Sequence, residues 1–288
     1  MKTVNSISGG KTSAYIAANY PADYNVFSLV RTSDKNCMFP DKKIRQVVSD
    51  KLGGVEFIGT LEMDTIIYTI LDLEQYIGRE INWVTGLTFE GLIDHPSNNM
   101  LPSPLRRYCT ADLKMKPMFE WWLKTIKTPA LFRIGFRANE QRRAKNVIEK
   151  YNENGFLEMK HIIGKHKNGN NKWKTTEWQR QEHPLISIDN PIYKDDVEKY
   201  WKGKPVRFAE INNCVGCFHR SVPLLKKMWE THGNKMQFFS DLEKDRKYPG
   251  DTLKASDDIT YQKIKEWKLQ TELSFDDFDE CDSGYCGL

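Results

Sequence analysis

This sequence has no apolar run long enough to cross a membrane. A secretory signal needs an unbroken apolar stretch near the N-terminus, and here the polar glycine break Ser8-Gly9-Gly10 interrupts residues 1–20. Neither sign of charge dominates, because 43 Lys and Arg face 39 Asp and Glu, and a net charge of +4 is too small to indicate nucleic-acid binding by itself. No internal repeat is present. These absences favour a cytoplasmic protein with no membrane partner.

Cysteine is also sparse for a chain held together by disulfides, with 6 in 288 residues. In a cytoplasmic protein such cysteines are more often metal ligands or redox thiols than disulfide partners. Apolar material, by contrast, is plentiful, because 39% of the residues are hydrophobic and 12% are aromatic. This composition is sufficient for the core of one large α/β domain or two small ones.

Hydrophobic periodicity predicts strands that alternate with helices. The first strand, at residues 2–7, ends in a glycine turn that leads directly into a helical pattern from Ala14. Further strands are expected at 25–30, 55–58, 130–134 and 206–211, and helices at 41–52, 63–76, 113–126, 195–201 and 223–231. Such alternation specifies parallel pairing with right-handed crossovers. We therefore expect an α/β fold with a doubly wound, mostly parallel sheet, helices on both of its faces, and ligands at the carboxyl ends of its strands.

Composition predicts where this pattern is interrupted and where it ends. Prolines make residues 85–105 loop-like, and in residues 158–182 lysines interleave with tryptophans around the turn Asn168-Gly169-Asn170. We expect a projecting basic hairpin in the second segment, inserted in a main domain of residues 1–225. Residues 226–288 are expected to form a helical C-terminal extension with an acidic, cysteine-containing tail.

The segment Ser8-Gly9-Gly10-Lys11-Thr12-Ser13 joins the first expected strand to the first expected helix. Glycines allow a ligand close to the backbone, while free N–H groups and the helix dipole favour an anion such as phosphate. The spacing between the glycines and Lys-Thr is too short for a Walker-type motif. An ordinary glycine turn is the alternative, and the position after the first strand favours a phosphate loop.

Three more segments follow in an order typical of a known family. They are Arg107-Tyr108-Cys109-Thr110 with Lys114 and Pro117, Gly135-Phe136-Arg137 with Glu140 and Arg143, and His183-Pro184-Leu185 followed by Cys214-x-x-Cys217. Together with the Ser-Gly-Gly-x-x-Ser loop they resemble the phosphoadenosine phosphosulfate (PAPS) reductase family, in the PP-loop (adenine nucleotide α-hydrolase) superfamily. The resemblance covers roughly residues 1–225. The terminus Cys286-Gly287-Leu288 lacks the glutamate and histidine that accompany the family's nucleophilic cysteine.

The resemblance implies that the chain binds ATP or a PAPS-type adenine nucleotide. Mg²⁺ is a possible additional cofactor. The implied nucleotide-binding residues are Ser8, Gly9, Gly10, Lys11, Thr12, Ser13, Arg137 and Arg142. Lys11 and Arg137 would stabilise charge on the transferred group, because arginine suits bidentate binding of phosphate or sulfate. Cys286 is the third catalytic candidate. Arg143 has an alternative as part of a solvated helix face with Glu140 as its partner.

The spacing Cys214-x-x-Cys217 lets two thiolates bind one metal ion from a single turn. The resemblance adds Cys109 as a third ligand, and Cys286 or Cys281 would complete a set of four. Such a set holds a [4Fe-4S] cluster or zinc, and a metal-free redox dithiol is a further alternative. The resemblance favours the cluster. His219 is interpreted as a residue beside this site rather than a ligand.

Three functions follow from these features. The first is a PAPS-reductase-like enzyme acting on a sulfonucleotide or transferring sulfur. The second is ATP-dependent adenylation and thiolation of tRNA or DNA, for which the basic hairpin would bind the strand, although a solvated face is the simpler interpretation of its lysines. The third is a non-catalytic nucleotide-binding module with structural zinc. A homodimer and a thiol electron donor are compatible with the first.

Overall fold

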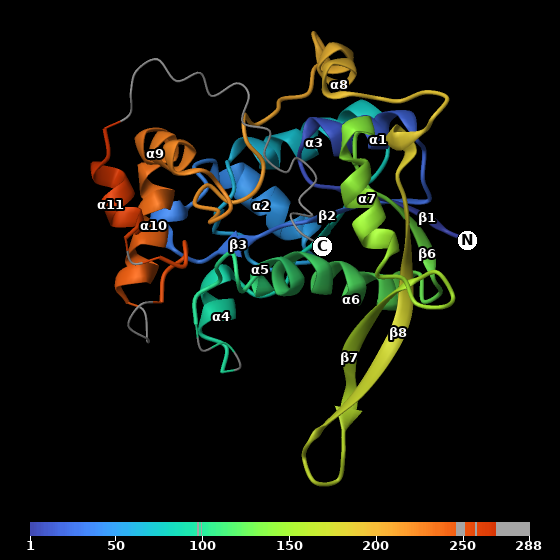
Figure 1. Cartoon of the computed structure of the whole chain (residues 1–288), viewed down its shortest axis with the longest axis horizontal. Coiled ribbons are helices and arrows are strands. Elements are labelled where there is room, and N and C mark those ends of the chain that lie inside the picture. Colours follow the sequence, from blue (N-terminus) through green and yellow to red (C-terminus); the bar gives the residue numbers. More distant parts are fainter. Residues whose placement is uncertain (97, 99, 246–250, 257, 269–288) are drawn as a thin grey trace.

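The computed structural model describes residues 1–96, 98, 100–245, 251–256 and 258–268. Its centre is a sheet of six strands in the order β5-β2-β1-β6-β8-β7 (Figure 1). The strands are β1 Thr3–Ile7, β2 Tyr24–Ser28, β5 Asn82–Val84, β6 Ala130–Arg133, β7 Leu157–Lys165 and β8 Asn171–Glu182. All neighbours pair in parallel except β7 and β8, which are antiparallel. The prediction of an α/β fold with a mostly parallel sheet is confirmed.

Helices and short segments connect these strands. The α-helices are α1 Lys11–Asn19, α2 Lys42–Lys51, α3 Thr65–Ile77, α4 Phe89–Ile93, α5 Tyr108–Thr110, α6 Lys116–Thr125, α7 Gln141–Ile148, α8 Lys194–Trp201, α9 Val222–Thr231, α10 Gly233–Lys244 and α11 Tyr261–Glu266. A π-helical turn, Ala111–Met115, joins α5 to α6. A separate two-stranded sheet is formed by β3 Arg31–Thr32 and β4 Gly59–Thr60.

Alternate residues of the central strands pack into two different cores. On β2, Val26 packs in a cluster with side chains of α6 and α7, whereas the next residue, Phe27, packs in a cluster with α1, α2 and α3. Successive side chains of a strand point to opposite faces of the sheet. Figure 1 accordingly shows α1 and α3 on one side of the strands and α6 on the other.

A third core joins distant parts of the sequence. Leu61, Phe89 and Leu113 pack in one cluster with Val215 and Phe239, and Leu253 and Ile264 belong to the same cluster. The described helices α9, α10 and α11 are therefore anchored to the segments that follow the N-terminal strands. This core spans the predicted boundary at residue 225, and the division of the chain there remains a prediction.

Two predicted strands are wrong. Residues 55–58 form no strand, because the Phe57 N–H donates to Ser49 Oγ at 2.9 Å rather than to a sheet. Residues 206–211 form none either, because the Arg207 N–H donates to Asp72 Oδ2 at 3.1 Å. The loop expected at 85–105 contains α4.

The predicted hairpin is confirmed, with a difference in its role. β7 and β8 pair from Leu157↔Gln179 to Lys165↔Asn171, and β8 also pairs in parallel with β6. The hairpin is therefore the edge of the central sheet as well as a projection from it. Among the described residues, no helix is both long and apolar enough to cross a membrane.

Candidate functional site

The strand order places the phosphate-loop segment at a change of direction in the sheet. From β1 the chain builds β2 and β5 on one side, and then β6 and β8 on the other side. In open α/β sheets, ligands bind outside the carboxyl ends of the strands at such a point. Residues 8–13 follow β1 and residues 135–137 follow β6. The contact between these two segments is close, since a Cβ on Gly135 would lie 3.2 Å from Thr12 Cγ2 and 3.3 Å from the Ser13 nitrogen.

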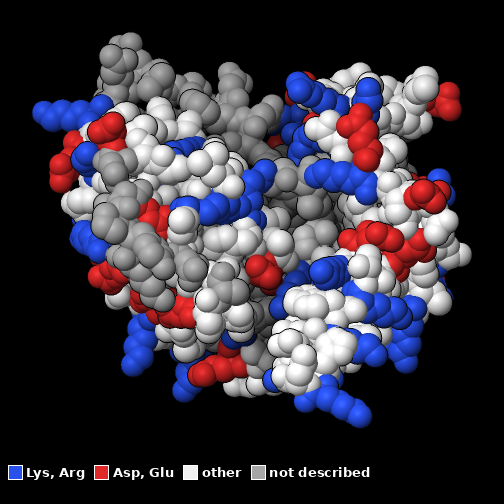
Figure 2. Space-filling model, turned by 60° about the horizontal axis from the view of Figure 1, so that its bottom comes forward, with Lys and Arg blue, Asp and Glu red and all other residues white. Residues whose placement is uncertain are grey.

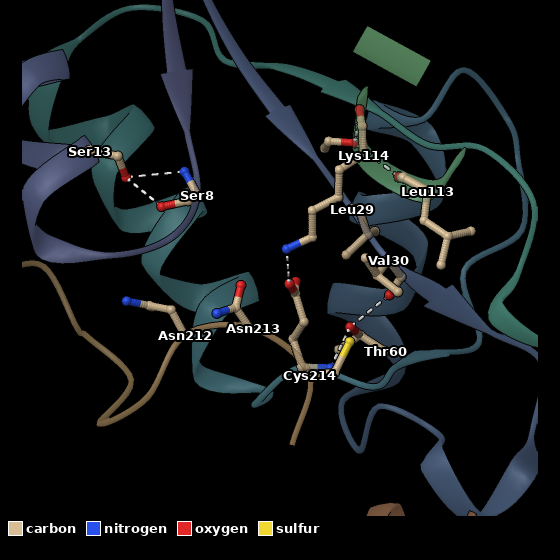
Figure 3. Close-up of polar contacts among 12 residues, drawn as sticks. Ser8, Ser13, Leu29, Val30, Thr60, Leu113, Lys114, Asn212, Asn213 and Cys214 are labelled. Carbon is tan, nitrogen blue, oxygen red and sulfur yellow. Dashed lines mark hydrogen bonds and ion pairs between the residues drawn. The ribbon is translucent and has the colours of Figure 1, made fainter. Parts of the chain in front are cut away.

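Two serine hydroxyls hold the loop in shape. Ser13 Oγ accepts a hydrogen bond from the Ser8 N–H at 3.1 Å and donates one to the Gly10 carbonyl oxygen at 3.0 Å. The Ser8 and Ser13 hydroxyl oxygens lie 3.1 Å apart (Figure 3). Gly9 has a φ of +82°, and a Cβ there would lie 2.6 Å from Ile66 Cγ2. The loop therefore requires glycine at this position.

Helix α1 begins directly at this loop. Gly10 is the N-cap residue and makes no side-chain cap hydrogen bond, and the first turn of α1 contains no acidic residue. The first N–H groups of a helix have no partner within it, and the positive end of the helix dipole lies there. This end of α1 is therefore suited to an anion such as phosphate.

Lys11 is held by a helix from much later in the chain. Its ammonium group forms an ion pair with Glu198 of α8, and its carbonyl oxygen accepts a hydrogen bond from Trp201 Nε1 at 2.9 Å. Lys11 would therefore have to leave Glu198 to neutralise a bound phosphate. Glu198 lies 187 residues after Lys11, and no local sequence pattern identified it as the partner of Lys11.

The arginines after β6 occupy different environments. Arg137 is only 5% exposed, and its backbone N–H and Nε donate to Glu140 Oε2 at 2.9 and 3.2 Å. Arg143 forms an ion pair with the other oxygen of Glu140, and its guanidinium carbon lies 4.5 Å from the centre of the Phe136 ring. Arg142 is exposed. Glu140 therefore forms ion pairs with both Arg137 and Arg143. It is the local partner that the sequence suggested for Arg143.

Three of the predicted metal ligands line one pocket. Cys109, Cys214 and Cys217 surround a cavity of about 50 Å³ together with Lys114 and His219. Burial raises the pKa of Cys109 to about 11, the neighbouring Cys217 adds to this, and the charge of Lys114 opposes it. Burial also raises the pKa of Cys214. A bound metal cation would favour the thiolate forms instead.

His219 lies on the wall of the same pocket. Burial lowers its pKa to about 4, and the charges of Arg107 and Lys254 lower it further. Its imidazole is therefore neutral near pH 7, which is the form that a ligand or a hydrogen-bonding neighbour of a metal requires.

The turn that carries Cys214 and Cys217 is braced from several sides. The buried Arg220 guanidinium donates to the carbonyl oxygens of Cys214 and Asn212 at 3.0 and 2.6 Å. Tyr261 donates its hydroxyl to the Gly216 carbonyl oxygen at 2.5 Å. A Cβ on Gly216 would lie 2.2 Å from an atom of the Phe239 ring, so the backbone packs directly on an aromatic side chain.

Glu62 is the residue of this region that sequence reasoning missed. It is 1% exposed, its Oε1 accepts a hydrogen bond from Lys114 Nζ at 2.9 Å, and its backbone pairs with that of Cys214. Burial alone would lower the pKa of Lys114, but the charge of Glu62 raises it above its ordinary value. Figure 3 shows Lys114 in the same region as Ser8 and the Asn212–Cys214 segment. No motif surrounds Glu62, so no sequence signal could have identified it.

The fit to a metal is partial. Cysteine is the ligand type of zinc and of iron–sulfur clusters, and three cysteines line one pocket. Within the described ranges, however, no group of three or more His, Cys, Asp or Glu side chains could hold a metal ion. Cys281 and Cys286, the alternatives for the fourth ligand, lie outside the described residues, as does the predicted acidic run near the C-terminus.

Comparisons of this chain with protein-family models, with curated proteins and with solved structures found no match.

Proposed function

We propose that this chain is a PAPS-reductase-like enzyme that binds ATP or a sulfonucleotide at the Ser8–Ser13 loop and catalyses sulfonucleotide reduction or sulfur transfer. The observation that carries the proposal is the close approach of Gly135 to Thr12 and Ser13, at the point where the strand order changes direction. Two of the four resembling segments thereby meet at the sheet edge where such folds bind ligands. The packing of helices against both faces supports the doubly wound arrangement that belongs to this proposal.

Each part of the loop has a role in this function. The N–H groups at the start of α1 would bind phosphate oxygens, and Lys11, once separated from Glu198, would neutralise their charge. Arg137 is buried beside Glu140, so its guanidinium is fixed in place before a ligand arrives. Such preorganisation reduces the reorganisation that charge stabilisation would otherwise need.

Two reactions fit this site. With ATP, a nucleophile bonds to the α-phosphorus while the bond from that phosphorus to the bridging oxygen breaks, and pyrophosphate leaves with the electron pair. With a sulfonucleotide, a cysteine thiolate bonds to the sulfur while the bond from sulfur to the phosphate oxygen breaks, and the nucleotide leaves. A thiol electron donor then attacks the modified cysteine, which releases sulfite and forms a disulfide. Cys286 is the proposed thiolate in this reaction, which requires Cys281 to be the fourth ligand of any metal in the cysteine pocket.

The cysteine pocket is proposed to hold a [4Fe-4S] cluster or zinc through Cys109, Cys214 and Cys217, with Cys286 or Cys281 as the fourth ligand. A cluster would add a polarising charge beside the nucleotide, whereas zinc would attach the C-terminal tail to the domain. Glu62 would keep Lys114 protonated at the pocket wall.

Binding of ATP and PAPS by isothermal titration calorimetry, with pyrophosphate and sulfite assays, tests the nucleotide proposal. We expect saturable binding that weakens about tenfold in Ser13→Ala, because one or two hydrogen bonds that shape the loop are lost. Ser49→Ala removes another hydroxyl that bonds to the backbone, distant in sequence from the loop, and is the matched control. Absence of affinity for both nucleotides would refute the proposal.

The visible spectrum and metal content of protein purified without oxygen test the cysteine pocket. A broad absorbance at about 400 nm that is lost in Cys214→Ala is expected for a cluster bound by thiolates. Colourless protein with one zinc ion would favour structural zinc. Metal-free wild-type protein in both analyses would contradict a metal site.

The bracing of the cysteine turn favours one second candidate, a non-catalytic nucleotide-binding module with structural zinc. Arg220, Tyr261 and Phe239 all support this turn, as expected where the metal stabilises a fold. Steady release of pyrophosphate or sulfite would exclude this candidate. Nucleotide binding without turnover, together with bound zinc, would support it.

A further inference from the structure

The β7–β8 hairpin extends away from the nucleotide edge of the sheet. β8 pairs with β6 only through Gln179 to Glu182, so its earlier residues, from Asn171, continue beyond the amino ends of the parallel strands. At about 3.3 Å per residue, the tip lies roughly 25 Å past the sheet. Figure 1 shows this hairpin as a separate arm. The arm is therefore not a wall of the nucleotide site.

The two faces of this arm differ. On the inner face, the ring of His161 lies 5.0 Å from the ring of Phe119 in α6. On the outer face, Ile162 pairs with Trp173, and these side chains are 50% and 51% exposed. The Lys160 ammonium lies 5.4 Å from the centre of the Trp173 ring. The outer face thus presents an exposed aromatic ring with a cation beside it.

The charge of the arm has one sign. Residues 159–176 contain no Asp or Glu, and their basic side chains, all exposed, are Lys160, Lys165, Lys167, Lys172 and Lys174. Figure 2 brings the arm forward and shows Lys and Arg side chains around it. This concentration contrasts with the nearly even charge of the whole chain, so the arm has a positive field of its own.

We propose that this arm binds single-stranded nucleic acid through the exposed Trp173, with Lys160 and Ile162 beside it on the outer face. Lys172 and Lys174, the neighbours of Trp173 along β8, point to the other face of the two-stranded ribbon, where Lys174 pairs with His161, and their long side chains contact phosphates of a strand that passes around the ribbon. An exposed tryptophan stacks on any base, while neighbouring lysines contact the phosphates. Bases of a duplex are not open to such stacking, so a single strand is the better partner. An anionic membrane is less suited, because the apolar side chains are few and lie on a narrow two-stranded ribbon rather than on an amphipathic helix.

This inference is independent of the nucleotide chemistry, since the arm projects from the other end of the strands. Its test is fluorescence anisotropy with labelled oligo(dT) and oligo(U) of about 15 nucleotides, without ATP, between about 50 and 200 mM salt. We expect binding that weakens steeply with salt. Trp173→Ala is expected to weaken it about tenfold, and Trp173→Phe less, because a stacking ring remains.

The lysines are tested separately. The triple variant Lys160→Gln, Lys172→Gln and Lys174→Gln should lower the slope of log affinity against log salt by about 2, since each phosphate contact contributes about 0.7 on single strands. The matched control replaces Lys35, Lys42 and Lys43, which are also exposed. Both triple variants change the net charge equally. Only the hairpin variant should lose affinity, with melting temperature and ATP affinity unchanged in both.

Three results would overturn the proposal. One is wild-type protein with no salt-sensitive binding at about 50 mM salt. Another is an equal loss in the hairpin and control variants, which would indicate a general charge effect. The third is preference for anionic phospholipid vesicles over oligonucleotides, lost in Trp173→Ala, which would assign the arm to a membrane surface. None of these results bears on nucleotide binding at the loop, which is measured separately.

Discussion

The two turns of the candidate site are supported in opposite ways. The Ser8–Ser13 loop is held mainly by its own two hydroxyls and by the absence of side chains at Gly9 and Gly135. The Cys214–Cys217 turn is held by distant residues, Arg220 and Tyr261, which bind its carbonyl oxygens. The loop therefore leaves backbone donors for a ligand, whereas the turn uses its backbone for stability and presents only its thiols. Substitutions should affect binding at the first and folding at the second.

The largest effect is expected from Gly216→Ala. The added Cβ would lie 2.2 Å from the Phe239 ring, so the turn or the ring must move within a buried cluster. Overpacking of this kind costs about 1–3 kcal/mol of unfolding free energy, and more where backbone is involved. Urea denaturation measures the loss. Gly233→Ala is the control, because a Cβ there meets nothing within 4 Å; equal stability of the two variants would contradict the bracing of the turn.

The next effect concerns acid sensitivity beside the loop. Burial lowers the pKa of His183, which stacks on Phe136, to about 4. Between that value and the ordinary pKa of about 6.5, only the unfolded chain binds this proton, so stability falls as the pH falls, by up to about 1.4 kcal/mol per unit. His183→Gln should reduce this slope in denaturation series between pH 4 and 6.5. The exposed His166→Gln should not, and an identical slope in all three proteins would contradict this assignment.

Ser13→Ala should separate binding from stability. The hydroxyl makes hydrogen bonds with Ser8 and Gly10, each worth about 1 kcal/mol in the folded protein. We expect a moderate fall in melting temperature and about a tenfold loss of nucleotide affinity. Arg220→Met, at the other turn, should show the reverse pattern, with a large loss of stability when folded protein can be obtained. If the two variants lost nucleotide affinity and stability in the same proportion, the proposed difference between the two turns would be contradicted.

The smallest effect is expected from Glu198→Gln. Its ion pair with Lys11 is partly exposed, and pairs of this kind contribute little. Removing it frees Lys11 for phosphate, so ATP affinity should rise about threefold and depend more on salt. Glu177→Gln removes a carboxylate from β8 and serves as the charge-matched control. Weaker binding in Glu198→Gln would mean that the pair positions Lys11 instead of restraining it.

Local patterns predicted the parts of this fold that depend on neighbouring residues. The strand, glycine turn and helix at residues 3–19 were predicted because their periodicity and glycine spacing are local. The hairpin was predicted for the same reason, from the Asn168-Gly169-Asn170 turn. The failure at residues 206–211 has a long-range cause, since Asp72 binds the Arg207 N–H that a strand would have offered to a neighbour.

The same distinction between local patterns and long-range contacts applies to the residues of the candidate site. Cys109, Cys214 and Cys217 could be grouped from sequence by the family resemblance, and they do line one pocket. Glu62 and Glu198 could not be identified from the sequence, because each forms an ion pair with a lysine distant from it in the sequence. Glu62 pairs with Lys114, and Glu198 pairs with Lys11. Partners of this kind depend on how helices pack, which periodicity does not specify.

The pairing of Leu61 and Glu62 with Cys214 and Val215 has a consequence for the growing chain on the ribosome. Leu61 and Glu62 are synthesised early, but the segment that pairs with them is synthesised much later. Closing so long a connection is slow compared with forming local contacts. Until then this core lacks the partners that follow residue 214, among them Val215 and Phe239, and the nascent chain exposes the apolar surface that they later cover.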